Sequence, residues 1–252
     1  MELKSALAER IPDRVFATTV AYAHRRFEPV LGLVKMFVGP NQTALDVGAW
    51  YGPWTHWLAR AAKSVVTVEA NPELADFVRR TAPPNVTVVG AAASDEAGTA
   101  TLWLPPGGKG TEGRASLHQQ GDFGRSTEVE TIRLDSLDVS DVGLVKIDVE
   151  GHELAALRGA EGIVRRWKPN LIVEVEERHS PAADTLSLID SWGYEGIYLK
   201  DGLWQPLADF DLVGHQRAMA DVAGQSYLRA IISKTGDRYV NTLVFRPRTG
   251  KN

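Results

Sequence analysis

The sequence predicts an α/β fold in which a mostly parallel sheet is covered by helices on both faces. From residue 43 onward, short runs of Val, Leu, Ile and Ala alternate with segments whose apolar residues recur every three or four positions, as strands and amphipathic helices require. The first of these strands leads into two glycines and then a helix, an order typical of a nucleotide-binding turn. Short apolar strands that alternate with helices indicate a parallel sheet with both faces covered.

The N-terminal 40 residues predict a helical extension, and residues 41–252 predict the α/β domain. Apolar residues recur at three and four positions in the extension, and Pro29 is expected to break or bend its helix. Strands are expected at residues 43–47, 64–70, 85–94, 144–151, 170–177, 194–200 and 239–247. Helices are expected at residues 54–62, 72–82, 152–167 and 184–193.

Two stretches depart from this alternation. Residues 100–137 contain two prolines and many glycines, and they predict short antiparallel strands outside the main sheet with a mobile loop at residues 105–114. Residues 201–237 predict irregular structure with a helical piece near residues 214–223. No internal repeat or domain linker is visible in the sequence.

The bulk composition is that of a globular protein. Of the 252 residues, 44% are hydrophobic and 24% charged, and the formal net charge is -4. This balance argues against a large nucleic-acid partner, which more often needs a basic surface. The chain has no Cys, which excludes disulfides, zinc–thiolate sites and Cys nucleophiles and makes the cytoplasm the expected location. The charged N-terminus predicts no signal peptide, and the apolar run at residues 30–38 is too short for a membrane span.

The strand at residues 43–47 ends in a turn that suits an adenosine joined to an amino acid. Gly48 and Gly52 are separated by three residues, whereas a dinucleotide-binding turn needs Gly-x-Gly-x-x-Gly. Asp46, before the first glycine, suits a ligand with a cationic end. Glu69 ends the next strand, where a carboxylate can accept hydrogen bonds from both hydroxyls of a ribose. S-adenosylmethionine (SAM) meets both demands.

Five blocks of the sequence resemble successive blocks of the FkbM family of SAM-dependent O-methyltransferases. They are LDVGAWYGPWT, VEANPE, GAAASDEAGTATLWL, LVKIDVEGHELAALRGA and LIVEVEE, and they lie in order between about residues 43 and 179. IDVEG followed by E-x-x-x-L-x-G-A is the block that singles out this family among class I methyltransferases. The resemblance implies a Rossmann-like, seven-stranded class I methyltransferase sheet. Its last strand, residues 239–247, would be antiparallel and lie beside residues 194–200.

The resemblance also assigns residues to the SAM site by position. The turn residues would contact the methionine part with help from a threonine, and an acid would bind its amino group directly or through water. A second acid would hold the ribose, and small residues would border the adenosine. In chain order these residues are Asp46, Gly48, Ala49, Gly52, Thr55, Glu69, Ala70, Asn71, Ala92 and Ser94.

Acids gather at the ends of the next two predicted strands. Strand alternation places Lys146, Asp148 and Glu150 on one face, and Glu174 with Glu176 on one face of the following strand. Carboxylates can take the proton of a hydroxyl acceptor, or hold Mg²⁺, which prefers oxygen ligands. The catalytic residues are therefore expected to be Asp148, His152 and Lys146. The metal ligands are expected to be Asp148, Glu174 and Glu176.

A structural role is the alternative for each of these residues. The acids could pair with Lys146, Arg165 or Arg166, and His152 could cap a helix. A solvated surface is expected for three residues of the N-terminal helix: His24, Arg25 and Arg26.

The leading hypothesis is an O-methyltransferase that acts on a sugar or oligosaccharide, assisted by Mg²⁺. FkbM relatives also methylate polyketides, so a polyketide or other small-molecule hydroxyl is an alternative acceptor. The Ala, Arg and Val content is typical of actinobacterial proteins, among which a relative methylates methylmannose oligosaccharides. Two other classes stay open: an NAD-dependent oxidoreductase, disfavoured by the glycine spacing, and a non-catalytic SAM-binding scaffold. The N-terminal helix or residues 201–237 could form an acceptor lid or a homodimer interface.

Overall fold

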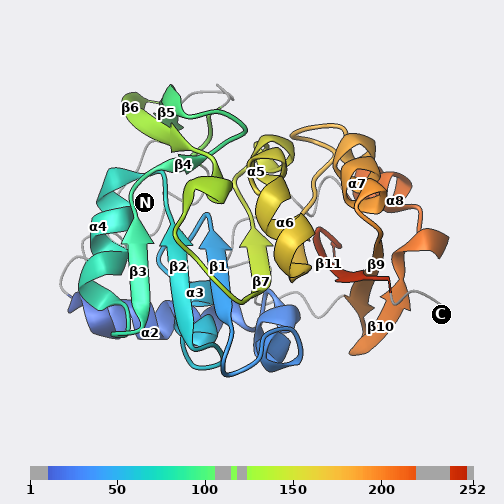
Figure 1. Ribbon diagram of the computed structural model, residues 1–252, viewed down its shortest axis with the longest axis horizontal. Coiled ribbons are helices and arrows are strands. Elements are labelled where there is room, and N and C mark those ends of the chain that lie inside the picture. Colours follow the sequence, from blue (N-terminus) through green and yellow to red (C-terminus); the bar gives the residue numbers. More distant parts are fainter. Residues whose placement is uncertain (1–10, 106–114, 118–123, 220–238, 249–252) are drawn as a thin grey trace.

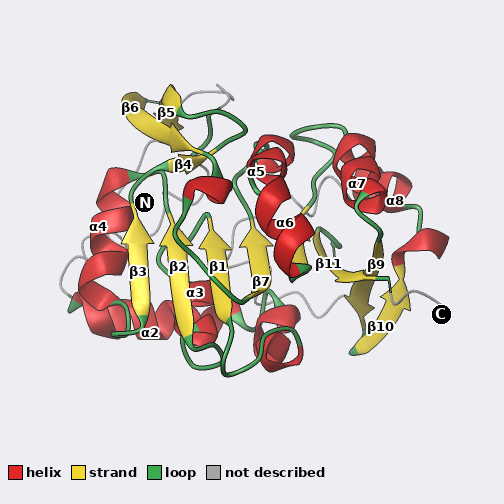
Figure 2. Cartoon of the chain, in the orientation of Figure 1, coloured by secondary structure: helices red, strands yellow, loops and turns green. Residues whose placement is uncertain are grey.

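The computed structural model describes residues 11–105, 115–117, 124–219 and 239–248, and it shows a sheet with helices on both faces (Figures 1 and 2). The main sheet has eight strands in the order β10-β9-β11-β8-β7-β1-β2-β3. Their bounds are Thr43–Val47 (β1), Ser64–Val68 (β2), Val86–Val89 (β3), Val142–Ile147 (β7), Asn170–Glu174 (β8), Tyr194–Lys200 (β9), Leu203–Pro206 (β10) and Thr242–Pro247 (β11).

The strand directions confirm the predicted class I methyltransferase sheet. Strands β3, β2, β1, β7 and β8 pair in parallel, and β11 is antiparallel between β8 and β9. One strand is additional, because β10 forms an antiparallel hairpin with β9. Asp201 and Gly202 connect the two strands with φ of 50° and 78°, as a tight hairpin turn requires. The Asp-Gly pair is thus a sequence signal for this hairpin, in a stretch where irregular structure was expected.

The helices follow the predicted alternation, with shorter pieces. Their bounds are Asp13–His24 (α2), Pro53–Leu58 (α3), Pro72–Thr81 (α4), Glu153–Gly159 (α5), Glu161–Trp167 (α6), Ala182–Ser191 (α7) and Leu212–Ala218 (α8). The 3-10 helices are Pro29–Met36 (η1), Leu134–Ser136 (η3) and Leu207–Asp209 (η4). The expected break at Pro29 separates α2 from η1. The helix expected at residues 152–167 is divided at Ala160, whose φ of -105° and ψ of 2° leave the helical region.

A second, three-stranded sheet lies above the carboxyl ends of β2 and β3 (Figure 1). It consists of Ala92–Ala93 (β4), Gly98–Leu104 (β5) and Arg125–Ile132 (β6), in the order β4-β6-β5. The antiparallel pair β5 and β6 confirms the prediction for this stretch. The single strand expected at residues 85–94 is wrong, because the chain leaves the main sheet after Val89 and joins the second sheet at Ala92. Most of the loop predicted at residues 105–114 lies outside the described residues.

Apolar clusters cover both faces of the main sheet. Leu45 and Val47 of β1 pack in one cluster with Leu157 of α5 and Val164 of α6. Ala44, on the opposite face of β1, packs in a second cluster with residues of η1 and α3. Every residue of β1 is therefore buried, including the acid that it carries. Among the described residues, no helix is long and apolar enough to cross a lipid bilayer.

Candidate active site

The candidate site lies where β1, β2, β7 and β8 end side by side. Asp46 and Val47 pair with Thr67 and Val68 of β2 on one side, and with β7 on the other. Strand β7 in turn pairs with β8. Because parallel strands finish at one edge, the residues that follow them meet there. The structure thereby brings the residues expected to bind SAM next to those expected to bind the acceptor.

Gly48 occupies a position that admits no side chain. Its φ is +79°, and a Cβ there would lie 1.7 Å from the carbonyl oxygen of Asp148. The Gly48 amide donates to the Val68 carbonyl at 2.9 Å, and the Asp148 amide donates to the Val47 carbonyl at 3.0 Å. The turn after β1 and the chain after β7 are therefore in direct backbone contact.

The rest of this turn is built on a second left-handed glycine and on aromatic packing. Gly52, with a φ of +77°, is the N-cap of α3 and precedes Pro53 at the first helical position, which suits helix initiation. Tyr51 is 3% exposed, and its ring lies 5.0 Å from that of Phe16 and 4.9 Å from that of Phe77. Tyr51 is thus a core aromatic that anchors the turn against α2 and α4.

Asp46 and Thr55 form a buried pair beneath the turn. The Thr55 hydroxyl donates to Asp46 Oδ2 at 2.5 Å, and the two residues are 0% and 1% exposed. Burial raises the pKa of Asp46, against the lowering effect of Lys146 and Thr55. The two side chains have little exposed surface, and the contact with SAM that the sequence predicts for them stays a prediction. From this buried position, the pair supports the turn after β1.

Lys146 lies between Asp46 and Asp148. Its ammonium group donates to the Gly48 carbonyl at 2.7 Å and lies 3.5 Å from an oxygen of each acid. Lys146 is 3% exposed. Burial disfavours its charge, but the surrounding acids, of which Asp148 and Asp46 act most strongly, together outweigh that effect and raise the pKa of Lys146 above its usual range. The enclosed position does not suit the direct catalytic contact that was expected of Lys146.

Glu69 stands at the end of β2, as predicted, and ties two loops together. Its carboxylate accepts from the amide of Trp50 at 2.8 Å and from that of Asn71 at 2.9 Å. Burial raises the pKa of Glu69 to about 7, although both amides oppose this shift. A carboxylate has about four acceptor positions, so this one retains capacity for the hydroxyls of a ribose.

The small residues expected around the adenosine lie under the second sheet. Ala70 packs against the apolar cluster that contains Ala92 and Leu102. Asn71 caps α4, because its side chain accepts from the Glu73 amide at 3.0 Å. Through that cap, Asn71 holds the loop after β2 in place.

His152 lies beside a residue that was expected to border the adenosine. It precedes α5, and its Nε2 is 3.1 Å from the hydroxyl oxygen of Ser94. The sequence placed His152 near the acceptor because it follows Asp148 by four residues. The chain turns through Glu150 and Gly151, with φ of 49° and 97°, and so directs His152 toward the residues that follow β4.

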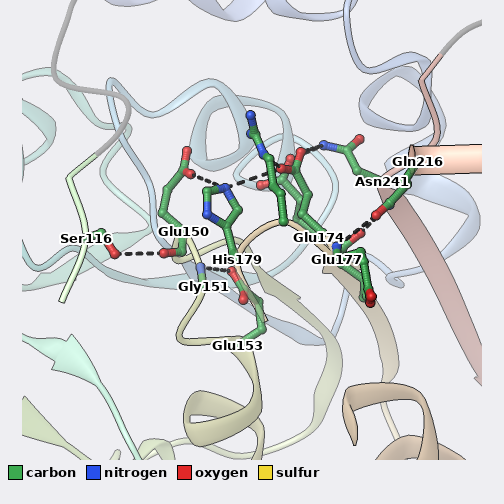
Figure 3. A network of polar contacts seen from close by, with 12 residues as sticks. Ser116, Glu150, Gly151, Glu153, Glu174, Glu177, His179, Gln216 and Asn241 are labelled. Atoms are coloured by element: carbon green, nitrogen blue, oxygen red, sulfur yellow. Dashed lines mark hydrogen bonds and ion pairs between the residues drawn. The ribbon is translucent and has the colours of Figure 1, made fainter. Parts of the chain in front are cut away.

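Asp148, Glu150 and Glu174 form the acidic cluster of the site. One carboxylate oxygen from each residue lies within 4.8 Å of the others. The left-handed turn at Glu150 brings its side chain back over the strand end, and the Ser116 hydroxyl fixes the Glu150 carbonyl at 2.8 Å. Figure 3 shows Glu150 and Glu174 on either side of His179. The sequence placed Glu150 on the correct face but left it out of the metal set.

The electrostatics of this acidic cluster suit a hard cation. Burial and the charge of Asp148 raise the pKa of Glu174 well above its usual value. The pKa of Asp148 is lowered despite its burial, because Lys146 and a hydrogen bond with Glu174 favour its charge. The two shifts run in opposite directions, so the charge of the pair is favoured on Asp148 and disfavoured on Glu174. Crowded oxygen donors of this kind are what Mg²⁺ prefers.

Glu176 belongs to a neighbouring group of ion pairs. His179 Nε2 is 3.3 Å from carboxylate oxygens of both Glu150 and Glu176, and these contacts raise the pKa of His179 to about 9. Glu176 also pairs with Arg178 and accepts from Asn241 at 2.9 Å. Glu176 follows β8, which ends at Glu174, and it is not part of the acidic cluster. The structure thus groups Glu150, and not Glu176, with Asp148 and Glu174, which differs from the metal set predicted from the sequence.

The N-terminal extension reaches the site through His24 and Glu28. His24 Nε2 lies 3.3 Å from Glu28 Oε2, with side chains 13% and 16% exposed. The ring of His24 lies 5.9 Å from that of Trp50, and its charge is among those that lower the pKa of Asp148, after Lys146 and Glu174. The expected solvated surface is therefore wrong for His24, whereas Arg25 and Arg26 are exposed. Helical periodicity alone does not show which end of a helix meets a sheet edge.

Glu28 anchors this extension to α3, and we expect its removal to destabilise the protein. The Trp54 indole donates to Glu28 Oε2 at 2.5 Å, and Trp54 is 2% exposed. Glu28→Ala leaves that buried donor without its acceptor, which should cost about 1–3 kcal/mol in the free energy of unfolding. Glu28→Gln keeps an acceptor oxygen and should cost less than half as much. Urea unfolding measures both, and equal losses in the two variants would contradict the anchor.

Comparisons with known proteins give one family and one fold. Residues 46–195 match the profile of the methyltransferase FkbM domain. The crystal structure of methyltransferase FkbM from Methylobacillus flagellatus KT is similar, with a TM-score of 0.50 and 16% identity over 83% of this chain and 44% of that one. This chain therefore spans less than half the length of that relative. No curated protein matches.

Two further solved structures are more distant. Precorrin 8w decarboxylase of Methanobacterium thermoautotrophicum has a TM-score of 0.45 and 15% identity over 71% of this chain and 83% of that one. SMU.1697c of Streptococcus mutans, in complex with S-adenosylhomocysteine (SAH), has a TM-score of 0.46 and 10% identity over 88% and 96% of the two chains. At these identities a likeness bears on the fold alone, and these two carry no further argument.

Proposed function

Because this chain belongs to the FkbM methyltransferase family, we propose that it transfers a methyl group from SAM to a hydroxyl of a sugar or oligosaccharide, with help from Mg²⁺. The observation that carries the proposal is the convergence of Asp148, Glu150 and Glu174 in backbone contact with the turn after β1. Membership in this family replaces the NAD-dependent oxidoreductase that the glycine spacing had disfavoured.

The turn after β1 and Glu69 would hold the methyl donor. Gly48, Ala49 and Gly52 offer backbone without bulk to the methionine part, over the buried support of Asp46 and Thr55. The Glu69 carboxylate would accept from the ribose hydroxyls, in addition to the two amides that it already binds.

The acidic cluster would prepare the acceptor. Methyl transfer is an in-line displacement: the acceptor oxygen bonds to the methyl carbon, the sulfur–methyl bond breaks, and its electron pair stays on sulfur. Asp148, kept ionised by Lys146, would hold the acceptor oxygen in line and take its proton. A Mg²⁺ ion held by Asp148, Glu150 and Glu174 would supply one thing more, a lower pKa for the hydroxyl.

The polarity of the site favours a polyhydroxylated acceptor over a polyketide. Several carboxylates and the charged His179 surround the place where the acceptor would lie. Sugar hydroxyls can donate to the carboxylates and accept from the charged His179. A mostly apolar acceptor would instead leave these buried polar groups unpaired, at a cost in binding free energy.

Transfer from radiolabelled SAM tests the proposal. The acceptors would be mannose oligosaccharides with and without methyl groups, a hydroxylated polyketide and simple alcohols, each with Mg²⁺ and with EDTA. We expect label in a sugar and its loss with EDTA. Label that survives EDTA would contradict the role of Mg²⁺. Label in the polyketide alone would contradict a sugar as the acceptor. No label in any acceptor, despite SAH binding, would support a non-catalytic SAM-binding scaffold.

The raised pKa of Glu69 predicts how SAH affinity depends on pH. Below about pH 7 the buried carboxyl is protonated and becomes a weaker acceptor for the ribose. Affinity should therefore rise by about 5- to 10-fold from pH 6 to pH 8 and then level off, since one linked proton allows at most about tenfold per pH unit. Calorimetric titration measures this. Glu69→Gln should bind weakly at all pH values with no such rise, and the same rise in that variant would assign it to another group.

A further inference from the structure

Lys146 joins the two halves of the site by contacts that leave it little freedom. Asp46 and Lys146 are register partners on β1 and β7, so the pairing of the strands itself sets the lysine beside the acid. From there the ammonium group reaches the Gly48 carbonyl at 2.7 Å and Asp148 Oδ2 at 3.5 Å. One ammonium group thus touches both the turn expected to hold SAM and the carboxylate expected to hold Mg²⁺ and the acceptor.

We infer that Lys146 is a positioning residue that couples binding of the methyl donor to binding of Mg²⁺, by sharing its ammonium group between the turn after β1 and Asp148. This inference rests on the proposed function, because it uses the Mg²⁺ site proposed there. The 4% exposure of the Lys146 side chain leaves no surface for a substrate, so its effect on the reaction passes through its neighbours.

The charges around Lys146 predict that each ligand strengthens the binding of the other. Asp46 and Asp148 share one ammonium group at equal distances of 3.5 Å, and in a water-poor interior such pairs interact strongly. A cation that takes an oxygen of Asp148 weakens the hold of that acid on Lys146. A ligand that fixes the Gly48 carbonyl draws the ammonium group toward the turn and leaves Asp148 free for the cation. Both ligands favour the same position of the lysine, so each should strengthen the other, by the same factor.

Calorimetry with two ligands tests this coupling without turnover. Mg²⁺ is titrated into the protein with and without saturating SAH, and SAH with and without Mg²⁺. In the wild type we expect each ligand to tighten the other at least about fivefold. Lys146→Gln should reduce that factor to within about twofold of one, and Lys146→Arg should restore part of it, because a guanidinium can reach both acids. Lys63→Gln, which changes an exposed lysine, should leave the factor unchanged.

Two outcomes would overturn the inference: no coupling in a wild type that binds both ligands, or full coupling in Lys146→Gln. If Lys146→Gln does not fold, Asp46→Asn serves instead. It leaves the lysine to pair with Asp148 alone, so Mg²⁺ affinity in the presence of SAH should fall at least about fivefold, although Asp46 is 0% exposed. Unchanged Mg²⁺ affinity in that variant would also overturn the inference.

Failure of the metal site is distinguishable from failure of the link. If the wild type binds no Mg²⁺ at about 10 mM, a concentration above the dissociation constants of even weak Ca²⁺ sites in proteins, the Mg²⁺ part of the proposed function is lost, and with it the coupling. Titrations with SAH alone then test the positioning role of Lys146. Lys146→Gln should weaken SAH at least about fivefold with recovery in Lys146→Arg, and unchanged SAH affinity in a cooperatively folded Lys146→Gln would overturn it.

Discussion

Gly48→Ala is expected to lower SAH affinity about 10- to 100-fold, since overpacking a tight contact costs about 1–3 kcal/mol. The added methyl carbon would lie 1.7 Å from the Asp148 carbonyl oxygen, so the turn after β1 or the chain after β7 has to move. Either movement displaces the turn expected to hold the methionine part, and it separates Asp148 from Lys146. Thermal unfolding should show a loss of stability as well.

Gly202→Ala is the matched control for this change. Gly202 has a φ of +78°, nearly the same as Gly48, but nothing lies within 4 Å of an added Cβ. Both variants therefore pay the cost of a left-handed Ala, about 1–2 kcal/mol, and only Gly48→Ala adds the collision. SAH affinity equal in the two variants would show that the close approach to Asp148 does not matter for binding.

Asp148→Asn is expected to lower kcat/KM for methyl transfer about 10²- to 10⁴-fold, the usual contribution of a group that moves a proton. The amide cannot take the acceptor proton, and it is a poorer ligand for a cation. SAH affinity without Mg²⁺ should change much less, because the backbone contacts of Gly48 remain. Steady-state kinetics with the labelled sugar measure the first effect, and calorimetry the second. A loss confined to KM would contradict the role in the chemical step.

The glutamates decide which carboxylates bind the cation. Glu174→Gln and Glu150→Gln should each weaken Mg²⁺ at least about tenfold, whereas Glu176→Gln should leave it within about threefold. Burial disfavours the charge of Glu174, so Glu174→Gln, which removes that charge and keeps the shape, should unfold no more readily than the wild type. Unchanged stability of Glu174→Gln would show that its weaker Mg²⁺ binding comes from the missing carboxylate and not from damage to the fold. If Glu176→Gln lost Mg²⁺ and Glu150→Gln kept it, the metal set expected from strand alternation would be the correct one.

Several local features of this protein could be predicted from the sequence. The run Thr43–Val47 and its two glycines predicted a strand and turn because both depend on residues close in the chain. Glu69 at the end of β2 followed from the length of the strand. The missed hairpin at Asp201–Gly202 was equally local, so a stricter use of turn propensities would have found it.

The sequence by itself determined the order of strands and helices, the family and the strand ends at which the acids gather. Only the tertiary structure decided which acids meet. Glu150 joins Asp148 because the chain turns back through a left-handed conformation. Glu176 lies two residues beyond the end of β8 and pairs with Arg178 and His179. Lys146 is enclosed because Asp46 stands beside it on a neighbouring strand a hundred residues earlier in the chain. Periodicity fixes the face on which a side chain lies, but its partners depend on the pairing of distant segments, which no local pattern records.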